Sequence, residues 1–271
     1  MRLLKILLLL PIAALILVAC QTNAPDERVG EEPAKPSRQY YQLKVYSFVD
    51  ADQQVLTDEY LAETWLPAME RFEVGPVGVF KNRPGDDDTV RRTYVLIPYG
   101  SLAEWEQSEA MLHVDSVHNE TGKSFLQASH EVPPYQRVES ILLKAFEEMP
   151  TIKPTAVSGP RSERVYELRS YESPTEDLFH RKVDMFNAGG EVALFEKLGF
   201  NAVFYSEVIS GAHMPNLMYM TTFPNMESRE EHWEAFVDAP EWKEMSSLDK
   251  YQHTVSHADV MLLYPTEYSD Y

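Results

Sequence analysis

The sequence predicts an α+β protein made of two tandem units, each with the order β-α-β-β-α-β. Tyr41–Lys44 aligns with Tyr166–Arg169 at an offset of 125 residues (from 41 to 166), and Gly75 aligns with Gly199 at an offset of 124 (from 75 to 199). A near-constant offset over such a span is typical of a tandem duplication. Within each copy, alternating apolar segments and segments with helical spacing follow the order of a ferredoxin-like unit.

The first unit is predicted over residues 39–148. Its strands are expected at 40–46, 77–81, 92–99 and 135–146, where residues alternate or are rich in valine and tyrosine. The first helix is expected to begin at Thr57 as its N-cap and to end before Gly75. Its apolar face is formed by residues at helical spacing, namely Leu61, Trp65, Met69 and Phe72. The second helix is expected over 102–127.

A linker over residues 149–163, rich in proline and glycine, separates this unit from the second one at 164–271. The second unit repeats the order, with strands at 165–171, 201–208, 216–223 and 256–264 and helices at 175–198 and 226–251. Each unit forms an antiparallel sheet with helices on one face only. The other face needs a cover, and two tandem copies can cover each other, sheet to sheet.

Residues 1–20 differ in composition from the rest of the chain. Arg2 and Lys5 precede an almost wholly apolar run over 7–18, which is too short for a stable transmembrane helix. The run resembles a bacterial lipoprotein signal peptide with Leu17-Val18-Ala19-Cys20 as its lipobox. That resemblance implies that Cys20 is acylated and anchors the chain in a membrane of the bacterial cell envelope. The alternative is an ordinary signal peptide with an incidental cysteine.

The residue after Cys20 is Gln21 rather than aspartate, which favours the outer membrane over the inner one. Residues 21–38 carry three prolines, several charges and no aromatic residue, so they are predicted to be a disordered tether. Whether the folded part faces the periplasm or the cell surface is left open.

The composition excludes several classes of function. A net charge of −19 argues against nucleic acid as a partner, because phosphate binding needs basic patches. Cys20 is the only cysteine, which excludes disulfides, iron–sulfur clusters and thiolate zinc sites. We find no phosphate-binding loop and no nucleophile elbow, and we predict no cofactor.

Strand alternation indicates a candidate ligand-binding site. Leu43 and Val45 share one face of the first strand, and Tyr166 and Leu168 share one face of its second copy. If these apolar faces meet the helices, the polar faces point between the two sheets. The predicted ligand-binding residues are Lys44, Tyr46, Arg137, Glu139, Glu167, Arg169, Tyr171, His257 and Asp259. The alternatives are a seam of paired charges that only fastens the halves, or simple exposure to solvent.

Histidine spacing adds little to this site. His253 and His257 are four residues apart, as metal ligands on a helix can be, but they straddle a predicted helix end and strand start. We therefore predict no metal site. His180 and His213 lie near loops, from which they could reach the mouth of a cavity.

Several motifs resemble those of the NIPSNAP family. The second unit carries Tyr166-Glu-Leu-Arg-Ser-Tyr171, Phe195-Glu-Lys-Leu-Gly199, Pro215-Asn-Leu-Met-Tyr-Met220, Trp233-x-x-Phe236, Pro240-Glu-Trp242 and Pro265-Thr-Glu-Tyr-Ser269, and the first unit looks like a more divergent copy. The resemblance implies a dimeric α/β-barrel type of architecture, which the two halves of one chain can complete. It implies no catalytic set, so no catalytic residue is assigned.

Two classes of function follow. The first is a binding protein of the cell envelope that holds a small molecule or a partner protein between its two sheets. The alternative is an enzyme, a cofactor-independent oxygenase-like or lyase-like barrel, which rests on the fold alone. A homodimer is left open.

Overall fold

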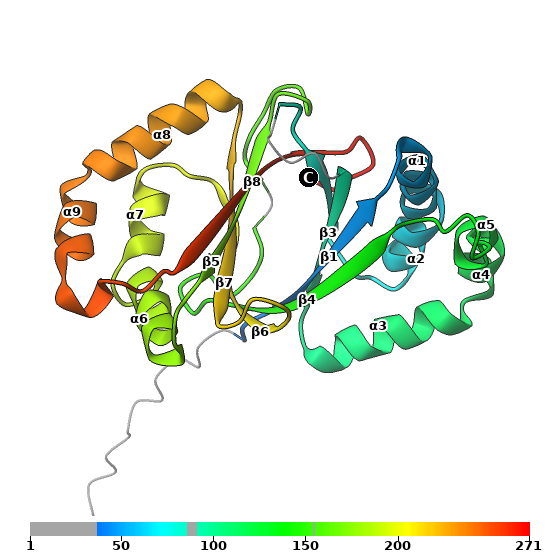
Figure 1. Ribbon diagram of the computed structural model, residues 1–271, viewed down its shortest axis with the longest axis horizontal. Coiled ribbons are helices and arrows are strands. Elements are labelled where there is room, and N and C mark those ends of the chain that lie inside the picture. Colours follow the sequence, from blue (N-terminus) through cyan, green and yellow to red (C-terminus); the bar gives the residue numbers. More distant parts are fainter. Residues whose placement is uncertain (1–36, 86–90, 154) are drawn as a thin grey trace, which may run out of the picture. The chain divides into compact units, whose positions relative to one another are not determined.

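Eight strands close into a single barrel in the computed structural model, and the helices lie outside it (Figure 1). The structure describes residues 37–85, 91–153 and 155–271. The predicted signal peptide, Cys20, most of the tether and part of the turn after Arg83 therefore lie outside the described residues. The strands are β1 (Tyr40–Phe48), β2 (Gly78–Asn82), β3 (Arg91–Tyr99), β4 (Arg137–Ala145), β5 (Val165–Glu172), β6 (Ala202–Ser210), β7 (Asn216–Phe223) and β8 (His257–Pro265).

Each repeat contributes four neighbouring antiparallel strands to the barrel. The order within the first repeat is β4-β1-β3-β2, and the order within the second is β8-β5-β7-β6. The repeats meet at two short junctions, where β2 pairs with β8 over Phe80–Asn82 and β4 pairs with β6 over Leu142–Ala145. The predicted fold class, two ferredoxin-like units that form a barrel within one chain, is confirmed.

The helices of the two repeats cover opposite sides of the barrel (Figure 1). The first repeat has α1 (Ala51–Tyr60), a π-helical turn (Leu61–Trp65), α2 (Leu66–Arg71), α3 (Leu102–Val114), α4 (Ser116–Thr121) and α5 (Lys123–Leu126). The second has α6 (Glu176–Phe186), α7 (Glu191–Lys197), α8 (Met226–Asp238), α9 (Pro240–Ser247) and a 3-10 turn (Asp249–Tyr251). In the part of the chain that the structure describes, no helix is both long and apolar enough to cross a membrane.

The prediction that Thr57 begins the first helix is wrong. The helix begins at Ala51, and the Asp50 side chain caps it by accepting a hydrogen bond from the Gln53 amide at 2.9 Å. Thr57 lies within α1, where its hydroxyl donates to the Pro134 carbonyl at 2.9 Å. The apolar periodicity starts only at Leu61, so the polar first turns of the helix carry little signal in the sequence.

The other long helices predicted from the sequence are interrupted. Asp115 separates α3 from α4: its backbone is extended, and its side chain caps the first turn of α4, which ends before Gly122. In the second repeat, α6 and α7 are separated by a turn in which Gly190 has a φ of 92°, a conformation that favours glycine. Pro240 lacks an amide hydrogen, so α8 ends before it and α9 begins with it.

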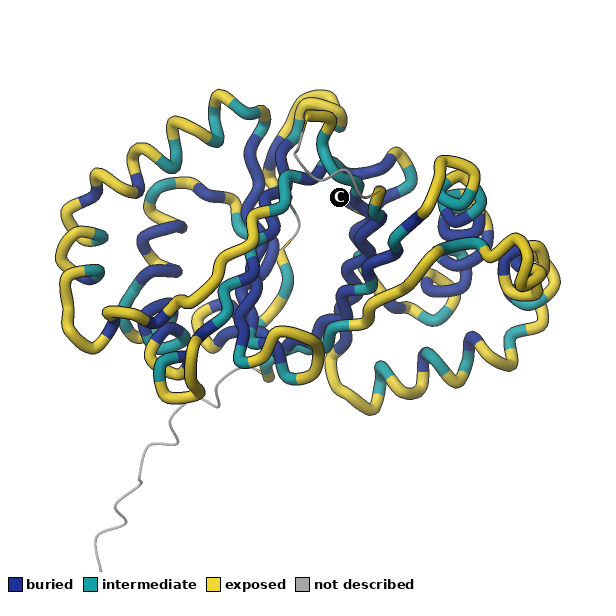
Figure 2. Tube along the Cα trace, viewed as in Figure 1, coloured by how far each residue is buried: buried dark blue, intermediate teal, exposed yellow. Residues whose placement is uncertain are grey.

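The interior of the barrel is an apolar core shared by both repeats. Tyr41 and Leu43 on β1 pack there with Tyr166 and Leu168 on β5, and all four are fully buried. An eight-stranded barrel is just wide enough for side chains to fill. Two further cores lie between the barrel and the helices, one in each repeat. In Figure 2 the strands are accordingly buried along most of their length, except for the first halves of β4 and β8.

One end of the barrel, the end at which β1 and β5 begin, is closed by connecting segments. Residues 266–271 cross it: Ser269 accepts a hydrogen bond from the Val79 amide at 2.9 Å, and Tyr271 packs into the interior core. Arg38, predicted as part of the tether, is instead fastened to the barrel, where its guanidinium bonds Glu207 at 2.6 Å. The other end, at which β1 and β5 finish, is called the mouth.

Candidate functional site

The polar faces of β1 and β5 point toward the helices rather than into the barrel. Lys44 reaches α3, where its ammonium lies 2.8 Å from Glu109, and Tyr46 packs in the core beneath the first-repeat helices. The predicted orientation of these two strands is therefore wrong. The physical reason is that both faces of these strands are buried, so alternation alone does not tell which face lies inside.

A buried charge network occupies this outer layer in the second repeat. The Glu167 carboxylate is fully buried and accepts four hydrogen bonds. Arg229 donates through Nε at 2.7 Å and Nη2 at 3.1 Å, Arg169 donates through Nε at 2.6 Å, and the Trp233 indole donates at 2.8 Å. Because Arg229 and Trp233 lie on α8, the network fastens this helix to β5.

Arg169 is held from its other sides as well. Its guanidinium lies 3.8 Å from the centre of the Trp233 ring and donates to the Tyr171 hydroxyl at 2.7 Å. Tyr171 in turn bonds the hydroxyl of Tyr219 at 2.9 Å. Burial holds the pKa of Tyr219 well above its ordinary value, so this group stays neutral at physiological pH. Glu167, Arg169 and Tyr171 thus form a seam of paired groups between strand and helix.

The remaining four predicted residues face the mouth of the barrel. Arg137 and Glu139 lie on β4 in register with Ser47 and Val45 of β1, and His257 and Asp259 lie on β8 in register with Glu172 and Ser170 of β5. Glu139 and Asp259 line a cavity of about 210 Å³, called the mouth pocket. Its walls are Leu43, Val45, Arg92, Tyr94, Glu139, Ile141, Leu168, Ser170, Ala212, His213, Asn216, Met218, Asp259 and Met261.

The mouth pocket has an apolar floor and a polar rim. Met218 and Leu168 form part of the floor, above the shared interior core. Asn216 donates to the Ser170 hydroxyl at 2.8 Å, and both side chains are buried. The rim carries Glu139 from the first repeat and Asp259 from the second, so the pocket exists only because the two repeats meet.

Further titratable groups surround the rim. His257 Nε2 lies 3.1 Å from an Asp259 carboxylate oxygen, and His213 Nδ1 lies 3.1 Å from Glu172 Oε1. His213 is on the loop between β6 and β7 and has a φ of 61°, which is uncommon outside glycine. The prediction that His213 could reach a cavity mouth agrees with this placement. His180 is an exposed residue of α6 and does not line the mouth pocket.

Glu172 was not singled out in the sequence, although a signal for it exists. Leu168, Ser170 and Glu172 alternate along one face of β5, and the predicted strand stopped one residue short of Glu172. Ser170 and Asn216 could not be predicted, because single small polar residues in a strand carry no pattern of their own.

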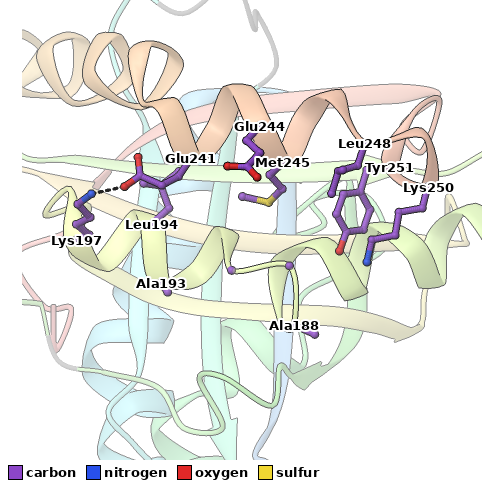
Figure 3. A pocket seen from close by; sticks show the side chains of 12 residues that line it. Ala188, Ala193, Leu194, Lys197, Glu241, Glu244, Met245, Leu248, Lys250 and Tyr251 are labelled. Carbon is purple, nitrogen blue, oxygen red and sulfur yellow. Dashed lines mark hydrogen bonds and ion pairs between the residues drawn. The ribbon is translucent and has the colours of Figure 1, made fainter.

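A larger groove lies among the outer helices of the second repeat. It has a volume of about 540 Å³ and runs between α7 and α9, with Leu194, Met245 and Tyr251 along its base (Figure 3). An ion pair between Lys197 and Glu241 closes one end. The groove belongs to one repeat only, and most of its charged groups are already paired, Lys197 with Glu241 and Lys250 with Asp184. Since binding sites combine an apolar body with a few convergent polar groups, the mouth pocket is the better candidate.

A known protein family matches the second repeat. Residues 166–270 match the model of the NIPSNAP family. The second repeat is a NIPSNAP domain. No curated protein matches the sequence.

Solved structures with a similar fold align over most of the chain. A putative monooxygenase from Lactobacillus acidophilus aligns over 84% of this chain and 94% of its own, with a TM-score of 0.53 and 13% identity. Another from Fusobacterium nucleatum covers 84% and 93%, with a TM-score of 0.52 and 9% identity. An anthrone oxidase-like protein covers 84% and 92%, with a TM-score of 0.52 and 10% identity. At such identities the likeness concerns the fold alone, a barrel that the first repeat and the NIPSNAP domain form together in this chain.

Proposed function

We propose that the chain is a membrane-anchored protein of the bacterial envelope that binds a small molecule in its mouth pocket. The observation that carries this proposal is the pocket itself, with an apolar floor beneath a rim that holds carboxylates from both repeats. Its volume of about 210 Å³ lies below the roughly 300–1,000 Å³ typical of drug-sized ligands. The ligand is therefore small, with an apolar body and a group that donates hydrogen bonds to Glu139 or Asp259.

Native mass spectrometry of the protein purified from its own host tests this proposal. We expect the wild type to retain a small molecule and the Met218→Trp variant, whose indole fills the floor, to lose it. Met218 is buried, so a tryptophan there can also disturb folding. The isosteric double variant Glu139→Gln/Asp259→Asn changes exposed positions only and provides a second test. It should retain less ligand than the wild type.

Two variants serve as controls in the same experiment. Lys44→Ala removes a charge from the helix side of β1, and Leu248→Trp fills the groove between α7 and α9. Both should retain the ligand as the wild type does. Retention by Met218→Trp together with loss in Leu248→Trp would place the ligand in the groove and refute the proposal.

A second candidate is a cofactor-independent barrel enzyme of the oxygenase-like or lyase-like kind. It is favoured by the imidazole and carboxylate of His257 and Asp259, which lie 3.1 Å apart at the rim, where they could move a proton. Structural neighbours described as monooxygenases or oxidases support this candidate by fold alone. Conversion of the retained molecule that stops in His257→Gln, while retention persists, would favour catalysis over binding.

The membrane anchor rests on the lipobox-like Leu17–Cys20 and on Cys20 being the only cysteine. We expect an alkynyl palmitate analogue to label the wild-type protein in its host and not the Cys20→Ala variant. The variant should also leave the membrane fraction, because several acyl chains are needed for stable attachment. Equal labelling of both proteins would contradict acylation at Cys20. Gln21 after Cys20 favours the outer membrane as the place of attachment.

A further inference from the structure

We propose that the rim of the barrel binds a divalent transition-metal ion through Glu172, His257 and Asp259, with His213 as a fourth ligand. This set of four residues, called the rim cluster, lies beside the mouth pocket, because Asp259 and His213 also line that pocket. The inference does not depend on an organic ligand in the pocket.

Strand pairing places the first three donors together. In the β5–β8 register, Glu172 is opposite His257 and Ser170 is opposite Asp259, so all of these side chains are on the inner face at the mouth. One ligand atom from each of Glu172, His257 and Asp259 lies within 4.8 Å of the others. Bonds of 2.0–2.2 Å in a tetrahedral site separate the ligand atoms by roughly 3.3–3.6 Å. Small side-chain rotations therefore suffice to bring these donors around one ion.

His213 supplies the fourth donor from a different element. Its Nδ1 atom already lies 3.1 Å from Glu172 Oε1. The side chain is 71% exposed, so it can turn without disturbing a packed neighbour. With His213 included, the donor set becomes two imidazoles and two carboxylates, whose charges balance a divalent ion.

The chemistry of these donors selects the kind of metal. Imidazole nitrogen suits zinc, iron, copper or nickel, whereas calcium and magnesium prefer sites made of oxygen alone. Two carboxylates with two imidazoles are compatible with zinc in four-coordinate geometry. Zinc is therefore the probe of choice, and magnesium serves as the negative control.

The first repeat has the same fold without an equivalent cluster, so the sheet does not need these four residues in order to form. The β1–β4 pair at the mouth of the first repeat has Ser47 opposite Arg137, with Glu139 two residues further along β4. Those strands pair in the same way without a histidine and with one carboxylate. The rim cluster is thus a specific feature of the second repeat.

Isothermal titration of the full chain in detergent, without a polyhistidine tag and after chelator treatment, tests the site. We expect about one equivalent of Zn²⁺ to bind and Mg²⁺ not to compete. His257→Ala and Glu172→Gln should each weaken Zn²⁺ binding at least tenfold, while the thermal melting of the metal-free variants stays near that of the wild type. Co²⁺ should give a visible absorption band that these variants lose.

Two histidine controls make the result decisive. His113→Ala removes an exposed histidine of α3, and His253→Ala removes the histidine four residues before His257. Both should bind Zn²⁺ like the wild type. The proposal is overturned if no single-equivalent binding is seen, if His257→Ala binds as tightly as the wild type, or if either control weakens binding as much as His257→Ala does.

Discussion

Replacing Glu167 with alanine should lower the free energy of unfolding by about 3–5 kcal/mol, since it breaks a buried ion pair by removing one partner. Glu167 is fully buried and is the common acceptor for Arg169, Arg229 and Trp233. Without it, two guanidinium groups stay in the layer between β5 and α8 with no carboxylate between them. Urea denaturation of both proteins measures this difference.

The first repeat offers a matched control for this substitution. Gln42 occupies the corresponding position on β1, where it is 3% exposed and donates one hydrogen bond to Ser140 at 2.8 Å. Gln42→Ala removes a neutral group and should cost about 1 kcal/mol. If Glu167→Ala costs no more than Gln42→Ala, the charge network does not fasten α8 to the barrel. A change in the denaturant slope would instead indicate a change in the compactness of the native or unfolded state, or unfolding that is no longer two-state.

The Phe195→Ala variant should also be about 3–5 kcal/mol less stable, because removal of a buried aromatic ring leaves a cavity. Phe195 on α7 is 1% exposed and lies at the centre of an aromatic cluster. Its ring stacks on Phe236 at 4.7 Å between centroids and meets Phe200 at 4.7 Å and Trp233 at 5.8 Å. Loss of this ring removes contacts with α8 and with the α7–β6 connection together.

Val237→Ala is the control for the aromatic cluster. Val237 follows Phe236 on α8 but is 55% exposed, so its truncation should change the free energy of unfolding by less than about 0.5 kcal/mol. Thermal melting and urea denaturation should rank the variants in the same order. A cost for Phe195→Ala as small as that for Val237→Ala would show that the neighbouring rings close the cavity.

The order of elements was predictable because each element has its own periodicity. Which face of each strand points into the barrel was not predictable, because alternation separates two faces without saying which one is inside. Leu43 and Lys44 illustrate the difficulty, since Leu43 lies in the barrel and Lys44 lies beneath a helix with its charge paired. On β7 every residue is buried, so alternation carries no information there. In a barrel wrapped by helices, both faces of a strand are interior.

The site was predictable only in part, for a related reason. Glu139 and Asp259 could be found because they occupy matching positions on the last strand of each repeat. The approach of Glu172 to His257 depends on the register of two strands that are far apart in sequence. His213 reaches the rim from a loop, and its backbone conformation has no signature in the residues around it.

The two short junctions of the barrel have a consequence for solubility. Among the described residues, the first halves of β4 and β8 have a neighbouring strand on one side only, and their side chains are exposed. Open strand edges can pair with other chains and begin aggregation unless charged residues occupy them. The charged and polar residues on these edges are also the ones that shape the mouth, namely Arg137, Glu139, His257 and Asp259. Any adaptation of the mouth toward a more apolar ligand would therefore make the protein more prone to self-association.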